Sequence, residues 1–462
     1  MPNIQLEDTI AALATPPGEG GLAIIRVSGP EAFRLAGRTF VPRRGKMEEF
    51  ASHTVHLGEI RSQDGQMIEQ ALVTVFRAPN SYTGQDVLEI SCHGGLVITR
   101  RILDDLIQAG ARHAEPGEFT KRAFLNGRMD LTQAEAVLDL IKARSDKALE
   151  AAARQLAGSL SRKFKSLRDS LMHLLAHMEA CLDFPDENLD VYADTELLNK
   201  LAAIRAEMAA LLGSFRRGAL LREGVSLVLV GRPNVGKSSL FNALLERDRA
   251  LVSEHAGTTR DVLEEALEIQ GVYVHLADTA GLGHETDHPV DRLGIERTRE
   301  ILPQGDIFLY IVDGSAPLSP ADNAVLAEIP AGKPRVMVIN KSDLPQAFSA
   351  ADLEKFSGLK DAVKLSARSG AGLEMLEKQI YACMDAAGTG EGEQITRLRH
   401  KNALEKSLAA IQNAESALME RRSLEYVTLD IKNALDELRE LIGEIYSEDL
   451  LDVIFAEFCI GK

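Results

Sequence analysis

The sequence predicts a multidomain protein with an α+β N-terminal domain, an all-α helical domain formed from two sequence halves, and an α/β domain inserted between those halves. Three observations carry this prediction: short strand-like runs near the start, helical periodicity on both sides of the middle, and alternating strands and helices within it. At 462 residues the chain is also too long for one ordinary domain. The predicted domain boundaries divide the chain into residues 1–120, 121–223, 224–385 and 386–462.

The first 120 residues have the texture of strands joined by turns. Short apolar runs at residues 22–27, 71–76 and 87–90 are separated by clusters of Gly, Pro and Asn. Runs of this length that are bounded by turn residues are typical of β-strands. We therefore expect an α+β domain here.

The helical domain is indicated by caps and by apolar spacing. Thr132 and Glu135 form a capping-box pattern ahead of an Ala- and Leu-rich helical stretch that reaches about residue 184. A second helix is expected from about residue 195 to residue 215. After a Gly-rich linker at residues 388–392, apolar residues recur at helical spacing: Val427, Ile431, Leu435, Leu438 and Ile445.

Composition excludes several classes of protein. The formal charge is −17 and no segment is strongly basic, so we expect neither DNA binding nor nonspecific RNA binding through phosphates. No apolar stretch is long enough to cross a bilayer and no basic, apolar leader opens the chain, which favours a cytoplasmic protein. The widely separated cysteines indicate neither a disulfide framework nor a zinc site: Cys92, Cys181, Cys383 and Cys459.

The inserted domain alternates strand-like and helix-like segments. Apolar runs at residues 225–230, 307–312, 336–339 and 363–365 are interleaved with helical patterns, which predicts a mostly parallel sheet covered on both faces. Between the first run and a helix-like segment lies Gly-Arg-Pro-Asn-Val-Gly-Lys-Ser, at residues 231–238. A glycine-rich loop in this context cradles phosphates, with Lys237 reaching the outer phosphates and Ser238 binding Mg²⁺. The sequence therefore predicts a Ras-like α/β P-loop domain.

The remaining nucleotide motifs follow in the order that a GTPase needs. Asp343 selects the base, because its two acceptor oxygens suit the adjacent N1–H and amine donors of guanine. Asp278 can hold Mg²⁺ through water, and Thr259 can close over the metal. The predicted GTP-binding residues are Asn234, Val235, Gly236, Lys237, Ser238, Ser239, Ser253, Glu254, His255, Ala256, Gly257, Thr258, Thr259, Asp278, Thr279, Ala280, Gly281, Asn340, Lys341, Asp343, Ser366, Ala367 and Arg368.

One position departs from many GTPases. The residue after Gly281 is Leu282, which can neither donate nor accept the hydrogen bond of a water-orienting Gln. Another group must position the water, and a monovalent cation near the phosphates would supply charge without a side chain. Asn234 is well placed to bind such a cation, and the alternative is that it only shapes the loop.

Together with these motifs, a set of flanking segments resembles one family, the bacterial and organellar tRNA-modifying GTPases MnmE, also called TrmE. The resemblance covers the whole chain. The flanking segments are residues 14–18 (Ala-Thr-Pro-Pro-Gly), 21–29, 80–84 (Asn-Ser-Tyr-Thr-Gly), 93–95 (His-Gly-Gly), 116–119 (Pro-Gly-Glu-Phe), 123–126 (Ala-Phe-Leu-Asn), 183–186 (Asp-Phe-Pro-Asp) and 458–462 (Phe-Cys-Ile-Gly-Lys).

The resemblance implies a homodimer formed through a folate-binding N-terminal domain. It also implies a heterotetramer with an FAD-dependent GidA-type partner, also called MnmG, with FAD on the partner only. Together they would install an aminomethyl-type (carboxymethylaminomethyl) group at carbon 5 of the wobble uridine of certain tRNAs. The one-carbon donor would be 5-formyl- or 5,10-methylene-tetrahydrofolate. By matched motif its pocket comprises Arg26, Glu89, Arg128 and Lys462. Arg and Lys suit the glutamate carboxylates of folate, and Glu89 suits the pterin N–H donors; the alternative is surface salt bridges.

The resemblance also implies a K⁺ site and a catalytic acid. K⁺ would be held by Asn234, Ser253, His255 and Thr258, and Mg²⁺ by Ser238 and Thr259. The family's usual water-positioning Glu is replaced by Asp291, so the expected catalytic residues are Asp291, Asn234 and Lys237. Glu285 is a less suitable substitute for that Glu, and Arg128 stands where the family also has Lys.

Some alternatives stay open. Cys459 could be nucleophilic, redox-active or only packed. A switch GTPase that assists ribosome assembly would share the nucleotide motifs, but it should carry a basic RNA-binding module. A one-carbon transferase with a regulatory GTPase domain would keep the folate and omit the tRNA.

Overall fold

The computed structural model describes residues 7–62, 64–183, 194–248, 265–278, 302–357, 362–385 and 393–462. The chain forms two compact units. The first unit comprises Met1–Ile141, Gln155–Met172 and Leu435–Lys462, and the second comprises Lys142–Arg154 and His173–Ala434. Each unit therefore joins segments that are distant in sequence. The finer domain boundaries predicted above stay a prediction.

The first unit contains a seven-stranded sheet, counted within the described residues, in the order β3-β4-β5-β6-β2-β1-β7. All neighbouring strands pair antiparallel except β1 and β7. The strands are β1 (Ile10–Leu13), β2 (Gly20–Ser28), β3 (Phe40–Pro42), β4 (Thr54–Arg61), β5 (Met67–Phe76), β6 (Val87–Gly94) and β7 (Arg112–His113). The predicted apolar runs fall in β2, β5 and β6, which confirms them.

Helices cover one face of this sheet. α1 (Ala32–Ala36) and α2 (Leu96–Ala109) bury apolar side chains against alternate residues of the strands, such as Ile25, Val73 and Ile90. A short 3-10 turn, η1 (Met47–Glu49), lies between β3 and β4. The unit also holds α3 (Glu118–Leu125), α4 (Leu131–Lys142) and α16 (Glu448–Ala456), and α4 packs with α16 in a separate apolar cluster.

The predicted helical stretch to residue 184 is divided into α4, α5 (Asp146–Leu156) and α6 (Ser159–Asp183). The Ser145 hydroxyl accepts the N–H of Ala148, which caps a new helix at that point. The predicted cap was wrong by two residues. Asp130 caps α4, because its Oδ1 accepts the N–H of Gln133 while the Gln133 side chain accepts the N–H of Asp130. Thr132 instead donates its hydroxyl to Asp130 at 2.7 Å.

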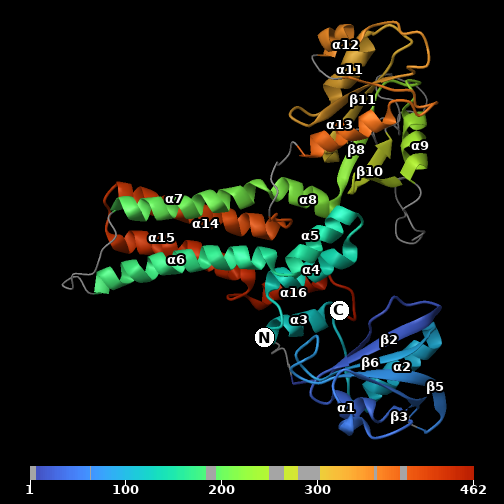
Figure 1. Ribbon diagram of the computed structural model, residues 1–462, viewed down its shortest axis with the longest axis vertical. Coiled ribbons are helices and arrows are strands. Elements are labelled where there is room, and N and C mark those ends of the chain that lie inside the picture. The colour runs from blue at the N-terminus through green and yellow to red at the C-terminus, as the bar shows by residue number, and fades with distance from the viewer. Residues whose placement is uncertain are drawn as a thin grey trace. The chain divides into compact units, whose positions relative to one another are not determined.

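Long helices from both sequence halves run side by side (Figure 1). They are α6, α7 (Asp194–Gly213), α14 (Leu398–Met419) and α15 (Leu424–Ile442). The shorter helix α8 (Phe215–Glu223) follows α7 in the chain. Val427, Ile431, Leu435 and Leu438 are buried along α15 as predicted. Ile445 is not: the helix ends at Ile442, where Gly443 turns the chain with φ of +79°.

The inserted domain forms a sheet in the order β13-β12-β11-β8-β10-β9, six strands among the residues described. Only β9 is antiparallel. The elements are β8 (Val225–Val230), α9 (Lys237–Asp248), β9 (Glu265–Ile269), β10 (Val272–Asp278), η2 (Leu302–Gln304), β11 (Ile307–Asp313), α11 (Pro320–Glu328), β12 (Arg335–Asn340), α12 (Ala350–Ser357), β13 (Val363–Lys364) and α13 (Leu373–Asp385).

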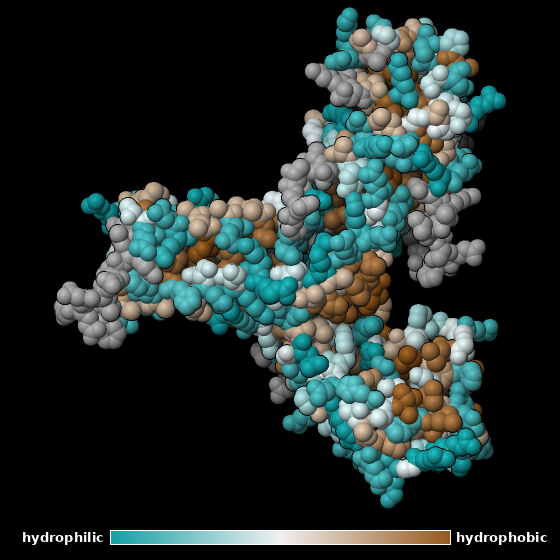
Figure 2. Space-filling view, viewed as in Figure 1, coloured by the Kyte–Doolittle hydropathy of each residue, from teal (hydrophilic) through white to brown (hydrophobic). Residues whose placement is uncertain are grey.

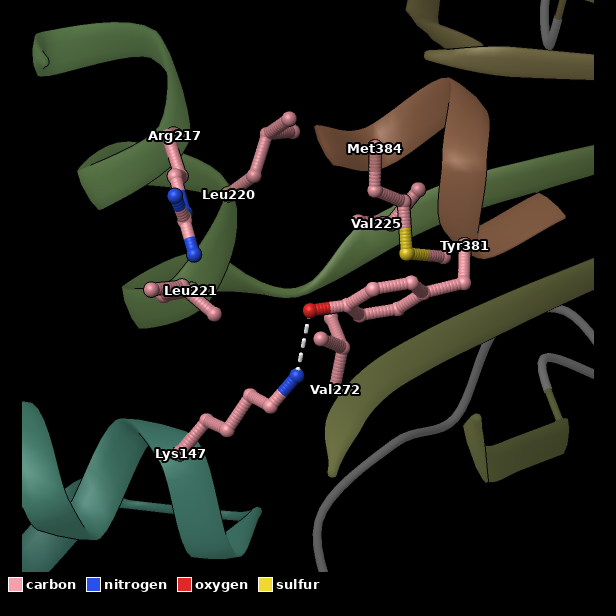
Figure 3. Close-up of a pocket in the computed structure, with 8 residues that line it drawn as sticks. All are labelled: Lys147, Arg217, Leu220, Leu221, Val225, Val272, Tyr381 and Met384. Atoms are coloured by element: carbon pink, nitrogen blue, oxygen red, sulfur yellow. Dashed lines mark hydrogen bonds between the residues drawn. The ribbon is translucent and has the colours of Figure 1, made fainter. Parts of the chain in front are cut away.

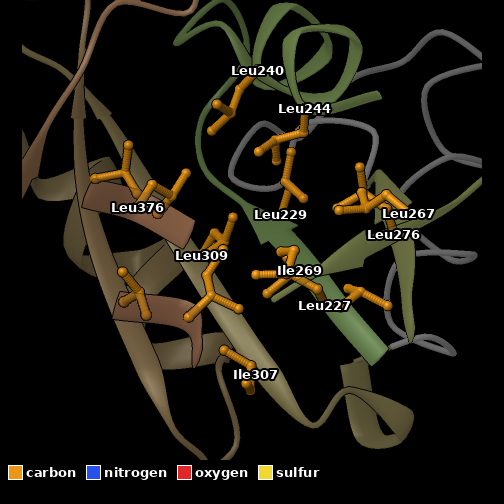
Figure 4. Close-up of a cluster of buried hydrophobic side chains, with 14 of the residues drawn as sticks. Leu227, Leu229, Leu240, Leu244, Leu267, Ile269, Leu276, Ile307, Leu309 and Leu376 are labelled. Atoms are coloured by element: carbon orange, nitrogen blue, oxygen red, sulfur yellow. The ribbon is translucent and has the colours of Figure 1, made fainter. Parts of the chain in front are cut away.

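Both faces of this sheet are buried, as predicted. Along β8, Leu227 and Leu229 enter one core, drawn in Figure 4, while Val228 and Val230 enter the core on the opposite face. This alternation explains the continuous apolar run in the sequence. Among the described residues, no helix is both long and apolar enough to cross a membrane.

Candidate nucleotide-binding site

The loop between β8 and α9 surrounds the ammonium group of Lys237. The Nζ atom of Lys237 donates to the carbonyl oxygens of Gly231 and Arg232, both at 2.9 Å. Lys237 is buried and is the first residue of α9, so the N–H groups of the first helical turn face this loop. A phosphate at the helix N-terminus would replace the two carbonyls as partners of the ammonium group.

Asn340, at the end of β12, ties this loop to the segment after β13. Its Nδ2 donates to the carbonyl of Val235 at 2.9 Å, and its Oδ1 accepts the N–H of Ala367 at 3.0 Å. Gly236 lies so close that a β-carbon there would stand 2.3 Å from Asn340 Nδ2, and its φ is +94°. Only glycine meets both conditions.

Lys341 supports the loop through a second contact. Its Nζ donates to the carbonyl of Asn234 at 3.0 Å and to Oδ2 of Asp313 at 2.6 Å. Burial raises the pKa of Asp313, but the hydrogen bonds from Lys341 and Ser315 outweigh it and leave that pKa below its ordinary value. An ionised carboxylate thus holds the Lys341 side chain beside the phosphate loop.

The carboxylate predicted to select the base is held in its ionised form. The hydrogen bond from Ser366 is the main cause that lowers the pKa of Asp343, and the charges of Arg368 and Lys341 add to it. An ionised carboxylate offers two acceptor oxygens, which match the two neighbouring donors of guanine. The structure therefore brings together these residues that the sequence singled out: Asn234, Val235, Gly236, Lys237, Asn340, Lys341, Asp343, Ser366, Ala367 and Arg368.

Asp278 completes the described part of this site. β10 runs parallel to β8, with Asp278 opposite Leu229 in register, so both strands end at the same edge of the sheet. The other predicted nucleotide, cation and catalytic residues lie outside the described residues: Ser253, Glu254, His255, Ala256, Gly257, Thr258, Thr259, Thr279, Ala280, Gly281 and Asp291.

Sequence reasoning missed one support of the phosphate loop. Nε of Arg232 donates to Oδ1 of the buried Asp322 at 2.6 Å. The other oxygen of Asp322 accepts the N–H and hydroxyl of Ser319 in a capping box that starts α11. The spacing of Ser319 and Asp322 was a visible capping signal, but nothing local to it indicated Arg232 as the partner.

A second site gathers the predicted folate residues in the first unit. Arg26 and Glu89 are paired across β2 and β6, and Arg26 donates to Glu89 Oε1 from Nε at 2.9 Å and from Nη2 at 2.7 Å. Arg26 Nη1 also donates to the carbonyl of Gly461 at 3.1 Å. Burial and the neighbouring charge of Arg26 lower the pKa of Lys462. Cys459, close by in sequence, is exposed.

Arg128 lies at a cavity of about 480 Å³ beside this group. The cavity is lined by His53, Phe76, Asn80, Ser81, Tyr82 and Arg128. Tyr82 links the two sets, because its ring also lies 5.5 Å from the guanidinium carbon of Arg26. The ring of Phe119 lies at the same distance from that carbon. Tyr82 was not predicted as a site residue, although it stands in the middle of the Asn-Ser-Tyr-Thr-Gly motif.

Two family models match the chain. The model described as the GTP-binding protein TrmE N-terminus matches residues 9–128, and the model described as the MnmE helical domain matches residues 131–459. The tRNA modification GTPase MnmE of Carboxydothermus hydrogenoformans is 44% identical over 99% of this chain and 100% of its own length. The protein of the same name from Symbiobacterium thermophilum is 46% identical over the same shares.

Among solved structures, Era of Aquifex aeolicus bound to GDP and aluminium fluoride is 28% identical, with a TM-score of 0.29, over 43% of this chain and 68% of that one. The family models and the full-length relatives agree with the resemblance inferred from the sequence motifs, and with the GTPase fold described above. The chain therefore belongs to the MnmE (TrmE) family of tRNA modification GTPases.

Proposed function

We propose that this protein hydrolyses GTP and uses the hydrolysis cycle to drive modification of the wobble uridine of tRNA. The observation that carries the proposal is the double hydrogen bond of Asn340, which joins the phosphate loop at Val235 to the base-recognition segment at Ala367. These two hydrogen bonds hold Lys237 and Asp343 in one site, which the binding of a guanine nucleotide requires. The relatives named tRNA modification GTPase support the tRNA substrate.

In the proposed mechanism each residue has a defined part. Lys237 moves from the loop carbonyls to the β- and γ-phosphates, and Asp343 accepts the guanine donors. Ser238 and Thr259 would hold Mg²⁺, which would neutralise phosphate charge when bound. Asp291 orients the attacking water, because Leu282 cannot do so. Ser238 at the start of α9 and Asp278 at the parallel end of β10 suit an oxygen-ligated cation.

We also propose that K⁺ stimulates the reaction. The Asn234 side chain is exposed and, among the described residues, has no hydrogen-bond partner, while its carbonyl is fixed by Lys341. The amide oxygen is therefore available as a cation ligand, together with Ser253, His255 and Thr258. A cation there would supply the positive charge that an arginine finger supplies elsewhere.

The test is the GTP turnover rate of the full chain in K⁺ and in Na⁺ at equal ionic strength. We expect faster turnover in K⁺, and loss of this difference in Asn234→Ala with GDP affinity retained. Equal rates in the two salts would contradict the K⁺ proposal. Analysis of tRNA nucleosides from a strain that lacks the protein tests the tRNA proposal, because an intact wobble modification there would rule it out.

The N-terminal sheet supports a homodimer and a folate site. Its uncovered face exposes Val41, Val55, Leu57 and Leu72, and Leu57 and Leu72 lie opposite each other on β4 and β5. Figure 2 shows apolar surface on the part of the chain that carries this sheet. Monomeric proteins seldom leave such patches open, so we propose that a second copy covers it.

By strand register the Arg26–Glu89 pair lies on this same face of the sheet. A tetrahydrofolate derivative would bind there, with the pterin at Glu89 and the carboxylates at Arg26, Arg128 and Lys462. The partner would be a GidA-type protein that carries FAD and forms a heterotetramer with the homodimer. We place the reaction in the cytoplasm, where tRNA is modified.

A further inference from the structure

The first turn of α5 contacts the turn between β9 and β10. The backbone N–H of Lys147 donates to the carbonyl of Gly271 at 3.3 Å. The aliphatic part of the Lys147 side chain lies over Gly271, where a β-carbon would come within 3.1 Å of it. A helix that belongs in sequence to the helical half thus contacts the hairpin of the GTPase domain directly.

The ammonium group of Lys147 continues to a third element. Its Nζ donates to the hydroxyl of Tyr381 on α13 at 2.6 Å and lies 4.1 Å from the centre of that ring (Figure 3). A cation over a tyrosine ring is attracted by the ring face, and the hydrogen bond adds direction. One lysine therefore connects α5, the β9–β10 turn and α13.

Arg144, three residues earlier, repeats the arrangement. Its Nη1 donates to the hydroxyl of Tyr273 at 3.3 Å, and its guanidinium carbon lies 5.4 Å from the centre of the same ring. Tyr273 is the second residue of β10. We name the group formed by Arg144, Lys147, Tyr273 and Tyr381 the α5 latch.

Lys147 and Tyr381 of the α5 latch line a small cavity of about 20 Å³. Apart from Lys147, Tyr381 and Arg217, the residues that line it are apolar: Leu220, Leu221, Val225, Val272 and Met384. A space of this size holds about one water molecule. Figure 3 shows α8 and the start of β8 meeting the latch, where the chain enters the GTPase domain.

The hairpin held by the latch is connected in sequence to both ends of the nucleotide site. β9 follows the segment with Ser253 to Thr259, and β10 leads from Tyr273 to Asp278 in five residues. β9 and β10 pair along their length and are joined by the turn at Gly271, so a displacement of either segment would reach this turn along a paired strand. At its other end α5 is anchored as well, since Gln155 donates to the carbonyl of Thr132 at 3.1 Å.

We propose that the α5 latch passes the nucleotide state of the GTPase domain to the helical domain, by closing in one nucleotide state and opening in the other. This inference rests on the proposed GTPase function. The latch suits the task because it is made of a few polar contacts at partly exposed residues, which break at low cost, unlike a buried apolar core. Its two tyrosines lie in the GTPase domain. Of its two cations, Lys147 lies in the first turn of α5 and Arg144 lies just before that helix.

The test is hydrogen–deuterium exchange of the full chain with GDP and with a non-hydrolysable GTP analogue. We expect the amides of residues 146–152 to exchange at rates that differ by about threefold or more between the two nucleotides. In Lys147→Met this difference should fall below about 1.5-fold, and in Lys147→Arg it should be retained, because Arg can reach the same ring and hydroxyl. The matched control is Arg154→Met on the exposed side of α5.

Tyr381→Phe keeps the ring and removes only the hydroxyl, so it provides a mild second variant with an intermediate loss. Unchanged exchange between the nucleotides in the unmodified chain, or an unchanged difference in Lys147→Met, would overturn the latch. Nucleotide affinity and GTP turnover are measured in the same samples. If the chain binds and hydrolyses GTP but α5 exchanges at the same rate with both nucleotides, only the latch proposal is wrong. If the chain does not bind GTP, the proposed function is wrong.

Discussion

Arg232 and Asp322 form an ion pair that fixes the second residue of the phosphate loop to the first turn of α11. The Nε–Oδ1 distance is 2.6 Å, and only 1% of the Asp322 side chain is exposed. The hydroxyl of Tyr310 donates to the carbonyl of Asp322 at 3.0 Å, so the acid is also held from β11. The carbonyl of Arg232 in turn receives the Lys237 ammonium, which places this pair one bond from the predicted phosphate site.

Arg232→Met should weaken GDP binding about tenfold, because the loop loses an anchor while a buried carboxylate loses its counterion. Isothermal titration of the full chain measures the effect. Arg335→Met is the control, since within the part of the chain that the structure describes Arg335 makes only a long hydrogen bond to the carbonyl of Pro330, at 3.4 Å. Equal affinities of the Arg232 variant and the unmodified chain would refute a role of this pair in nucleotide binding.

Asp291→Ala should lower the turnover number for GTP by about a hundredfold or more and leave GDP affinity unchanged, as expected for a group that orients water rather than binds nucleotide. Steady-state phosphate release measures turnover. Asp287→Ala, four residues earlier in the sequence, is the matched control. Unchanged turnover in the Asp291 variant would show that another residue orients the water.

Glu89→Gln should reduce affinity for 5-formyl-tetrahydrofolate by about tenfold, since the neutral amide cannot accept the pterin donors with full charge and no longer pairs with Arg26. Equilibrium dialysis gives the dissociation constant. Glu59→Gln, on β4 and separated from β6 by β5, changes a partly exposed acid that pairs with Arg61 and serves as the control. If the Glu89 variant binds as the unmodified chain does, the folate pocket lies elsewhere.

Acid should destabilise the first unit through Asp8 and Glu118. Burial raises the pKa of each, but hydrogen bonds from Arg112 and Arg122 outweigh it, and both pKa values fall below their ordinary 3.8 and 4.5. A carboxylate with a lowered folded pKa contributes stability that is complete above the unfolded pKa and is lost as pH falls through the folded value. The loss should therefore begin below about pH 4.5 and continue below pH 3.8.

The matched variant is Arg122→Met, which removes a fully buried cation from both acids. It should cost about 3–5 kcal/mol of stability and move the acid transition to higher pH, as followed by circular dichroism. Arg34→Met, at an exposed ion pair with Glu31, should leave the transition in place. An unshifted transition in the Arg122 variant would show that other groups control acid unfolding.

Cys92 should resist alkylation. Burial, with a smaller contribution from Glu69, raises the pKa of its thiol to about 11, from an ordinary 9.0. Its thiolate fraction near pH 8 is therefore about a hundredfold below that of an ordinary thiol. Mass spectrometry after iodoacetamide should find the exposed Cys459 modified first and Cys92 modified only on unfolding. Early modification of Cys92 would contradict its burial.

The nucleotide site could be predicted where its chemistry is local in sequence. Strand, loop, lysine and helix follow one another at residues 225–248, so the phosphate loop needed no knowledge of the fold. The same holds for the buried face of α15. The cap of α4 was misplaced because Thr132 and Asp130 both offer oxygens, and only the folded geometry shows that the Thr132 hydroxyl is used as a donor.

The contact of Arg232 with Asp322 and that of Arg26 with Tyr82 could not be predicted, for a different reason. Asp322 lies 90 residues beyond Arg232, and no periodicity links the two positions. Tyr82 reaches Arg26 because β2 pairs with β6 inside the sheet and Tyr82 lies in the turn that precedes β6. Contacts of this kind are fixed by strand order, which apolar spacing does not encode.

The bond from Arg26 to the carbonyl of Gly461 spans 435 residues of chain. During synthesis, the first sheet leaves the ribosome long before residue 461 exists, so the strands can pair while the side chain of Arg26 still lacks this partner. Translation that stops early would yield a chain that has its nucleotide-binding residues but lacks the Gly461 carbonyl that Arg26 binds. The residues of the nucleotide site are therefore all synthesised before the partner that completes the surroundings of Arg26.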